Sequence, residues 1–359
     1  MTSERKFSHL EICRDRDVGS RKETTHLEDA FFIHNAAPEI ALEDVNLTCK
    51  LFGKFISAPL LISAMTGGHP QTRRINENLA SAASELRLGM CVGSQRAALE
   101  NPALEGTFNV VREVSRDILI IANIGAAQLL APNGNTAGVR AVEMVDADAL
   151  AVHLNPLQEL VQPGGDSNYK GVLNAIKSLT KVVSVPVVVK ETGCGISRDV
   201  ASRLLDAGVA AIDVAGVGGT SWSAVEHYNA CSQGDELKAG IAETFWDWGI
   251  PTAMSICEVA SLSGRFTLIA SGGIKSGLDV AKSLALGADA AGIARPLLVP
   301  AFVGGKEVRT RLERVIRELR VAAMLVGAKR VADLKKSEVV ISGKLAEWLK
   351  ARKIRPGRP

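Results

Sequence analysis

The chain has 359 residues, of which 47% are hydrophobic, 23% are charged and only 4% are aromatic, a composition that suits one large α/β domain. A net charge of +3 is too small for a general nucleic-acid binder, and six scattered cysteines without a CxxC pair argue against a zinc site or a disulfide framework. No segment reaches the roughly 18 apolar residues that a membrane helix needs, and the charged start at Met1–Leu10 lacks the apolar core of an export signal. We therefore expect a cytoplasmic protein without a membrane or nucleic-acid partner.

Apolar runs bounded by Gly, Asn or Ser recur along the chain, and we count eight of them. Helical periodicity lies between several of these runs, as in Thr72–Leu86, Tyr169–Leu179, Ser197–Leu205 and Leu278–Leu286. Parallel strands that are buried on both faces form near-continuous apolar runs, so this alternation predicts a (β/α)8 TIM barrel, with a doubly wound open sheet as the alternative. The predicted strands are Pro59–Ala64, Leu88–Val92, Ile118–Ala122, Ala147–Val152, Val185–Val189, Ala211–Ala215, Thr267–Ala270 and Ala288–Ile293.

Three segments lie outside this repeating pattern of the barrel, which we place at residues 58–330. Residues 1–57 precede the first strand and predict an N-terminal arm with a small hairpin. Residues 221–260 fill an unusually long gap between strands six and seven, hold three of the four tryptophans, and predict a helical insertion. Residues 331–359 predict a solvated basic tail with a short helix, because Lys335–Pro359 carries eight basic and two acidic residues.

Polar or glycine-rich residues follow every predicted strand. In a (β/α)8 barrel the carboxyl ends of the strands meet on one face, and active sites lie there. Each end is weak by itself, since Gly and Ser are ordinary turn residues, but eight in register predict a functional face. These ends are Met65–Gly68, Gly93–Arg96, Asn123–Gly125, His153–Glu159, Lys190–Gly193, Gly216–Thr220, Ser271–Ile274 and Ala294–Pro296.

The end of the fourth strand, HLNPLQE at residues 153–159, carries the densest polar set. If the strand continues through Asn155, its two-residue period points His153 and Asn155 to the same side. Pro156 then stops the strand and sends Gln158 and Glu159 into the following loop. An imidazole, two amides and a carboxylate are thus predicted to converge at one rim.

The last two strand ends predict a phosphate site. Ser271–Gly277 offers backbone N–H groups and a helix N-terminus, and Gly292–Arg295 offers a second loop beside it, which is the usual phosphate site of this fold. With Asn123 and Lys190 also available, FMN is the flat cofactor that fits best. Lys190 is then expected near the electron-rich side of the flavin. The alternatives for this lysine are a buried ion pair with a carboxylate or, less favoured, a Schiff-base role.

These motifs resemble the type 2, FMN-dependent isopentenyl-diphosphate isomerases from Arg5 to about Gly327. The resemblance rests on the RKxxH sequence at Arg5–His9, on the strand-end motifs above and above all on HLNPLQE, since the glycine loops alone also suit other FMN barrels. Two positions depart from the family pattern: Ala215 stands where a serine is expected, and Lys275 where arginine is common. Both departures affect expected flavin contacts and leave the implied reaction intact.

The resemblance implies that isopentenyl diphosphate is converted to dimethylallyl diphosphate by proton addition and removal on reduced FMN, with NADPH as the reductant of the flavin. It also implies a homo-tetramer or homo-octamer. Gln158 and His153 are the implied catalytic residues, with Gln158 nearest the isoprenyl carbons, and Glu159 is the expected Mg²⁺ ligand. The implied substrate-binding residues are Arg5, Lys6, His9, Ser94, Gln95, Arg96, Asn155, Gln158 and Thr192. The implied cofactor-binding residues are Ala64, Met65, Thr66, Gly67, Ser94, Asn123, Lys190, Thr220, Gly273, Ile274, Lys275, Ala294 and Arg295.

Three other functions are compatible with a flavin-type barrel. An FMN-dependent 2-hydroxy-acid oxidase or dehydrogenase is the main alternative, but it needs a histidine base near the seventh strand end, and Ser261–Ile274 has no histidine. A flavin- or phosphate-binding protein without catalysis does not need the polar set at the fourth strand. An inosinate-dehydrogenase-like enzyme needs a reactive cysteine, for which Cys231 and Cys257 are the candidates.

Overall fold

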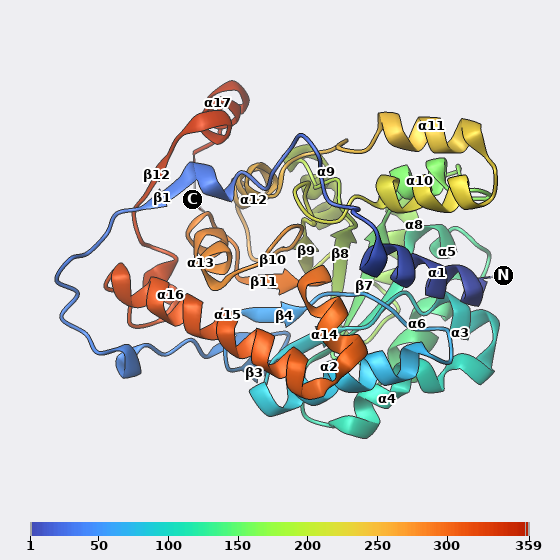
Figure 1. The fold of residues 1–359 in the computed structure, drawn as a ribbon, viewed down its shortest axis with the longest axis horizontal. Helices are drawn as coiled ribbons and strands as arrows, with labels where there is room; N and C mark the ends of the chain where they lie inside the picture. The colour runs from blue at the N-terminus through green and yellow to red at the C-terminus, as the bar shows by residue number, and fades with distance from the viewer. Residues whose placement is uncertain (1, 356, 358–359) are drawn as a thin grey trace.

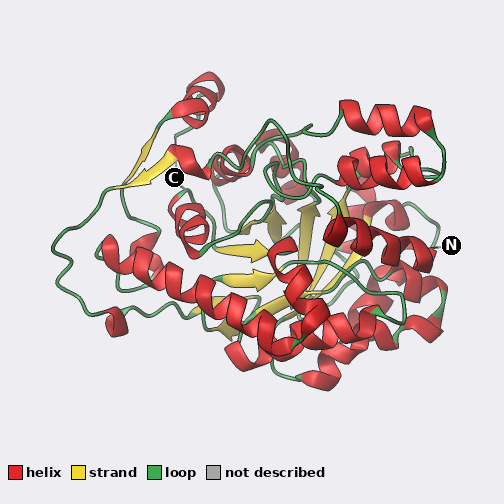
Figure 2. Cartoon of the chain, in the orientation of Figure 1, coloured by secondary structure: helices red, strands yellow, loops and turns green. Residues whose placement is uncertain are grey.

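Eight parallel strands close into a barrel in the computed structural model, which describes residues 2–355 and 357 (Figures 1 and 2). The strands pair in the order β10-β11-β4-β5-β6-β7-β8-β9, and β9 pairs with β10 to close the ring. The predicted (β/α)8 barrel is therefore confirmed, and the open sheet is wrong. The strands are β4 (Leu60–Ile62), β5 (Gly89–Cys91), β6 (Ile120–Gly125), β7 (Ala149–Leu154), β8 (Val187–Glu191), β9 (Ala211–Asp213), β10 (Thr267–Ala270) and β11 (Ala290–Ile293).

At least one helix follows each barrel strand on the outside of the ring (Figure 2). Helix α2 has its predicted bounds because Ile75, Leu79 and Ala83 recur every four residues and are buried on one face. The outer helices are α2 (Thr72–Leu86), α3 (Arg96–Glu100), α4 (Gly106–Val114), α5 (Ala126–Leu129), α6 (Gly134–Met144), α7 (Pro156–Val161), α8 (Val172–Leu179), α9 (Arg198–Asp206), α10 (Trp222–Ser232), α11 (Glu236–Thr244), α12 (Thr252–Ala260), α13 (Gly277–Ala285), α14 (Leu298–Val303) and α15 (Gly305–Leu325).

The barrel interior has an apolar layer below a polar layer. Because side chains alternate along a strand, an interior apolar residue is followed two positions later by another interior residue nearer the carboxyl end. On six of the eight strands the second residue of the pair at the carboxyl end is polar, and on β5 and β11 it is a glycine, Gly93 and Gly292. The six pairs that end in a polar residue are Leu61 and Ser63, Ile121 and Asn123, Ala151 and His153, Val188 and Lys190, Ala211 and Asp213, and Ile269 and Ser271.

The N-terminal arm contributes to both ends of the barrel. At the amino end, the predicted hairpin forms from β2 (Cys49–Leu51) and β3 (Lys54–Ile56), and Leu51 and Ile56 join the interior apolar layer. At the carboxyl end, α1 (Thr2–Asp15) lies beside α10 (Figure 1). The arm is thus a folded part of the molecule that plugs one end of the barrel and covers the other.

The C-terminal segment differs from the solvated tail that its composition predicted. After α16 (Val331–Leu334), strand β12 (Val339–Ile341) pairs antiparallel with β1 (Ala30–Phe32), and α17 (Gly343–Arg352) buries Leu345 and Leu349. Arg352 also donates from Nε to Oε1 of the buried Glu258 at 2.7 Å. The prediction of a solvated tail was wrong because it rested on the basic residues alone. The strand that pairs with β12 lies about 300 residues earlier, and the carboxylate that binds Arg352 lies on α12.

The predicted insertion between strands six and seven is present as the pair α10 and α11 (Figure 1). Trp246 is buried in one cluster with Ala224 and Val225 of α10 and Val18 of the N-terminal arm, so a small apolar cluster joins the insertion to the arm. Helix α12, by contrast, is buried throughout and packs on β10 as an ordinary barrel helix. Among the described residues, no helix combines the length and apolarity needed to cross a bilayer.

Candidate functional site

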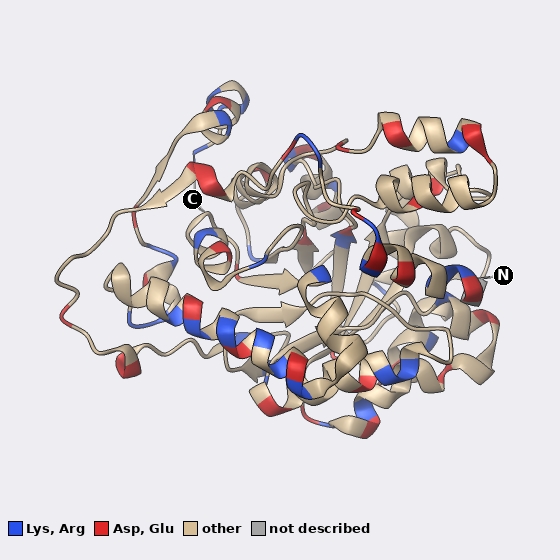
Figure 3. Ribbon diagram, viewed as in Figure 1, with Lys and Arg blue, Asp and Glu red and all other residues tan. Residues whose placement is uncertain are grey.

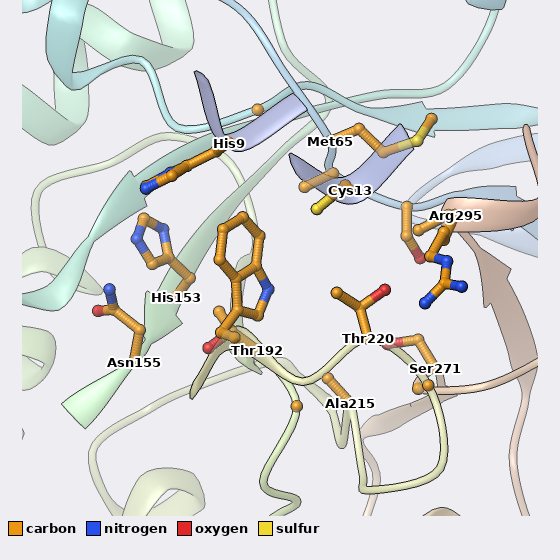
Figure 4. Close-up of a pocket in the computed structure, with 18 of the residues that line it drawn as sticks. His9, Cys13, Met65, His153, Asn155, Thr192, Ala215, Thr220, Ser271 and Arg295 are labelled. Carbon is orange, nitrogen blue, oxygen red and sulfur yellow. The ribbon is translucent and has the colours of Figure 1, made fainter. Parts of the chain in front are cut away.

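A cavity of about 670 Å³ lies at the carboxyl ends of the barrel strands, beneath α1. In Figure 4, His9, His153 and Asn155 lie on one side of the cavity, and Thr220, Ser271 and Arg295 lie on the other. The structure therefore brings together residues from all eight strand ends and the N-terminal arm. The predicted site residues that line the cavity are Arg5, Lys6, His9, Ala64, Met65, Thr66, Ser94, Arg96, Asn123, His153, Asn155, Gln158, Glu159, Lys190, Thr192, Thr220, Gly273, Ile274, Lys275, Ala294 and Arg295.

Two predicted site residues, Gly67 and Gln95, do not line the cavity. Gly67 has φ of 147°, and a Cβ there would lie 2.0 Å from the ring of Phe108, so only glycine fits. Gln95 is fully buried: its Oε1 accepts from the backbone N–H of Asn123 at 2.8 Å, and its Nε2 donates to the Ala141 carbonyl at 2.9 Å. We therefore assign Gln95 a supporting position behind the cavity wall in place of the predicted substrate contact.

A buried ion pair forms the floor of the cavity. Lys190 Nζ lies 3.0 Å from Asp213 Oδ2 and donates to Ser271 Oγ at 3.3 Å, and Ser271 Oγ donates to Asp213 Oδ1 at 2.5 Å. The alternative of a lysine paired with a carboxylate is thus confirmed for Lys190, which also lines the cavity. Asp213 was missed by our sequence reading, although an aspartate inside an apolar strand is a signal that could have identified it.

His153 is held as a neutral imidazole in one tautomer. Asn123 donates from Nδ2 to the Val92 carbonyl, so its Oδ1 is left to accept the bond from His153 Nδ1 at 2.9 Å. Nδ1 therefore carries the proton and Nε2 has a free lone pair. Burial, together with the charges of Lys6 and Lys190, lowers the pKa of His153 to about 3.

The residues after Pro156 form the short helix α7, so the predicted loop is wrong. Proline suits the first position of a helix, where its missing N–H is not needed. The helix brings Gln158 and Glu159 back over the strand end, where Asn155 Nδ2 lies 3.1 Å from Gln158 Oε1 and 3.2 Å from Glu159 Oε1. Glu159 Oε2 also accepts from the backbone N–H of Asp166 at 2.9 Å, which fixes the orientation of the carboxylate.

Helix α1 adds two cationic residues and an imidazole to the cavity. Lys6 donates from Nζ to the Ser94 carbonyl, and burial, with Arg5 and Arg96 nearby, lowers the pKa of Lys6 to about 7. His9 Nε2 lies 3.2 Å from Glu226 Oε1. These contacts make α1 an ordered wall of the cavity.

Glu226 of the insertion is the second charged residue that our sequence reading missed. It is fully buried, and its Oε1 accepts from Gln158 Nε2 at 3.0 Å while its Oε2 accepts from Asn229 Nδ2 at 3.0 Å. Burial alone would raise the pKa of Glu226, but the contacts with His9, Gln158 and Asn229 lower it overall. No local motif marks this residue, because only the folded insertion places α10 beside α7.

The side of the cavity near Thr66 and Lys190 fits a flavin. Thr66 Oγ1 is buried and has no hydrogen-bond partner, so a polar group is needed opposite it. Backbone at Gly273 and a guanidinium at Arg295 line the same side, and a cavity of this volume suits a cofactor with adjacent substrate. Among the described residues, no group of three His, Cys, Asp or Glu side chains could hold a metal ion. Glu159 stays the one metal ligand that the sequence predicts.

The cysteines considered for an inosinate-dehydrogenase-like reaction do not reach the cavity. Cys257 is buried in α12, Cys231 is exposed on α10, and neither lines the cavity. Neither of these two cysteines therefore supports this alternative.

Known proteins resemble this chain over nearly its whole length. Residues 167–341 match the FMN-dependent dehydrogenase family. The chain is 49% identical to an isopentenyl-diphosphate delta-isomerase of Methanothermobacter thermautotrophicus, covering 98% of this chain and 97% of the relative, and 47% identical to one of Archaeoglobus fulgidus, covering 98% and 99%. Among solved structures, a mandelate oxidase mutant with benzaldehyde has a TM-score of 0.64 at 20% identity, covering 94% of this chain and 95% of that chain, which supports the fold.

We expect Asp213→Ala to lower the free energy of unfolding by about 3 kcal/mol, because Lys190 then stays buried without its counter-ion. Urea denaturation measures this effect. Glu113→Ala, which removes an exposed partner of Arg73, is the control and should cost less than about 1 kcal/mol. Replacing both charges, as in Lys190→Met with Asp213→Leu, should recover part of the loss. Equal effects of the two alanine variants would contradict the buried pair.

We expect the protein to lose stability as pH falls below about 6.5, because unfolded His153 takes up a proton there while the folded imidazole stays neutral to about pH 3. Between pH 7.5 and 4.5 the wild type should lose about 2–3 kcal/mol more than His153→Gln, measured by urea denaturation. His34→Gln, at an exposed histidine, should behave like the wild type. A pH profile of His153→Gln that matches the wild type would show that His153 is not responsible.

Proposed function

The chain belongs to the FMN-dependent type of the isopentenyl-diphosphate delta-isomerase family, and we propose how its cavity carries out that reaction. The enzyme moves the double bond of isopentenyl diphosphate to give dimethylallyl diphosphate. The observation that carries the proposal is that α1 and α7 bring cationic, amide and carboxylate side chains to the same cavity that Lys190, Ser271 and Arg295 line. Isomerisation requires a proton to be added at one carbon and removed from another, so both ends must hold their ligands rigidly.

The diphosphate binds at the cationic end in this proposal. Arg5, Lys6 and Arg96 supply charge-assisted donors, and Asn155 and Thr192 supply neutral polar groups from neighbouring strand ends. Because the pKa of Lys6 is lowered to about 7, diphosphate binding favours proton uptake by this lysine. His153, held neutral with an unprotonated Nε2, does not donate to phosphate oxygens there, and we propose that it supports the neighbouring polar side chains of this end.

Glu159 would hold Mg²⁺ in this proposal, and the ion would offset the negative charge of the substrate diphosphate. Mg²⁺ is usually held by one or two carboxylates together with substrate phosphates and water. The hydrogen bonds from Asn155 Nδ2 and from the Asp166 backbone N–H fix the orientation of the Glu159 carboxylate. A fixed orientation favours metal binding by a carboxylate that is the single protein ligand.

Gln158 lies nearest the reacting carbons in this proposal. Its amide is fixed between Asn155 on one side and Glu226 on the other, and Glu226 also contacts His9 of α1. This connected set positions a neutral amide without introducing a charge beside the alkene. When bound, reduced FMN supplies an electron-rich surface and an exchangeable proton, and we propose NADPH as the reductant that keeps the flavin reduced.

We also propose a cytoplasmic homo-tetramer or homo-octamer. The insertion exposes Leu237 and Trp248, which are 74% and 62% exposed, and Leu160 of α7 is exposed beside Lys238 of α11. Apolar side chains grouped on one helical pair are typical of subunit contacts.

The 2-hydroxy-acid oxidoreductase remains the second candidate because the family match at residues 167–341 and the fold are shared with such enzymes. Against it, the segment Ser261–Ile274 lacks a histidine base, and the relatives that match nearly the whole chain are isomerases.

We expect Gln158→Ala to lower kcat by about 10²-fold or more while Kd for FMN and for the diphosphate barely changes, because the amide acts at the reacting carbons. Glu159→Gln is the matched comparison, since it lies one residue away on the same helix. It should mainly raise the Mg²⁺ concentration needed for half-maximal activity and raise KM. Normal kcat in Gln158→Ala, or unchanged Mg²⁺ dependence in Glu159→Gln, would exclude the assigned role.

We expect the enzyme to be inactive with oxidised FMN and active after anaerobic reduction by NADPH or dithionite. It should then turn over many substrate molecules without further reductant, and in heavy water the product should acquire deuterium, as mass spectrometry detects. Turnover needs no further reductant because proton addition and removal involve no net oxidation, and the added proton comes from the solvent. Stoichiometric NADPH consumption, or flavin reduction by a 2-hydroxy acid, would instead support the oxidoreductase.

A further inference from the structure

The start of α13 is already occupied by protein carboxylates. The backbone N–H groups of Lys275 and Ser276 donate to Asp279 Oδ2 at 3.0 and 2.9 Å, and that of Gly277 donates to Glu318 Oε2 at 2.8 Å. Our sequence reading expected these groups to bind the flavin phosphate, and the structure contradicts that part of the expectation. A phosphate beside Asp279 and Glu318 must instead be held by groups that also offset these negative charges.

Arg311 is a cation in the right place that neither the sequence motifs nor the family resemblance marks. It lies on α15, an outer helix, yet it is half-buried and lines the same cavity as Gly273, Lys275 and Arg295. Its Nη2 donates to the Lys275 carbonyl at 3.0 Å, so the side chain is fixed next to the loop that follows β10. One hydrogen bond leaves the other guanidinium N–H groups available to a ligand.

Two neighbouring arginines of α15, a helix that carries both signs of charge (Figure 3), are paired with carboxylates, whereas Arg311 is paired with none that the structure describes. Arg309 pairs with Glu85 at 2.7 Å and with Glu313 at 3.0 Å, and Arg314 pairs with Glu318 at 2.8 Å. Arg311 has no carboxylate partner within 4.0 Å in the described part of the chain. A half-buried guanidinium without a carboxylate, directed at a cavity, points to an anionic ligand.

We propose that Arg311 binds the phosphate monoester of the flavin together with Arg295, and that it thereby selects FMN over riboflavin. This inference rests on the proposed function, because it assumes that a flavin occupies the side of the cavity near Lys190. A planar guanidinium forms paired hydrogen bonds with phosphate oxygens and keeps its charge at all relevant pH values. Ser271 and Arg295 lie on the side of the cavity opposite His9 and His153 (Figure 4). Arg311 donates to the carbonyl of Lys275, in the loop that follows Ser271, so we assign it to the cofactor and not to the substrate diphosphate.

The test compares the affinities of FMN and riboflavin for each protein variant. Apo-protein is titrated with FMN and with riboflavin, following quenching of flavin fluorescence, for the wild type, Arg311→Gln and Arg311→Lys. Arg317→Gln, at an exposed arginine of the same helix, is the matched control. We expect Arg311→Gln to raise Kd for FMN at least about tenfold, equivalent to about 1.4 kcal/mol, and to leave Kd for riboflavin within about twofold. Arg311→Lys should fall between, and Arg317→Gln should match the wild type.

The outcomes separate this inference from the proposed function. If the wild type binds neither flavin, the proposed function fails. If the wild type prefers FMN and the ratio of the two Kd values is unchanged in Arg311→Gln, or if only KM for isopentenyl diphosphate rises, the assignment of Arg311 is overturned. Thermal unfolding without flavin shows whether each variant is folded. Should Arg311→Gln unfold, Arg311→Lys decides in the same way, since an unchanged FMN-to-riboflavin ratio in that variant also overturns the assignment.

Discussion

The two-residue period of the barrel strands is the constraint on which the site depends. Side chains at alternate positions point into the barrel, so moving two residues toward the carboxyl end replaces the apolar layer with a polar one. The ion pair of Lys190 with Asp213 lies in that upper layer, directly above the apolar residues Val188 and Ala211. A one-residue shift in register would turn both charges into the apolar space between strands and helices, and the floor of the cavity would be lost.

The walls of the cavity come from segments that are far apart in the chain and are connected by buried polar contacts. Glu226 of the insertion contacts Gln158 of α7 and His9 of α1, so three elements share one carboxylate. Removing any of these partners leaves buried polar groups unpaired, which costs more than the bond itself contributes. The arm and the insertion are therefore parts of the site as well as additions to the barrel.

Basic residues line the cavity in two groups, to which we assign different anions. The group proposed for the diphosphate comes from α1 and the second strand end. The flavin end draws them from Lys275, Arg295 and Arg311, because Asp279 and Glu318 occupy the first N–H groups of α13. Lys190 is neutralised by Asp213 between the two ends, which limits repulsion among these cations in a low-dielectric interior. In the proposed function, these separate cationic groups keep the two phosphate-bearing ligands apart.

The sequence by itself determined the eight strands, the hairpin, the insertion and most of the cavity-lining residues, because strand periodicity and polar strand ends are local signals and HLNPLQE resembles one family closely. It did not determine that Pro156 begins a helix, that Gln95 lies behind the wall, or that the basic C-terminal segment pairs with β1. Nor did it identify Glu226 or Arg311, which lie on helices whose own periodicity is ordinary. These features depend on contacts between segments distant in the chain, and only the tertiary structure decides which of them meet.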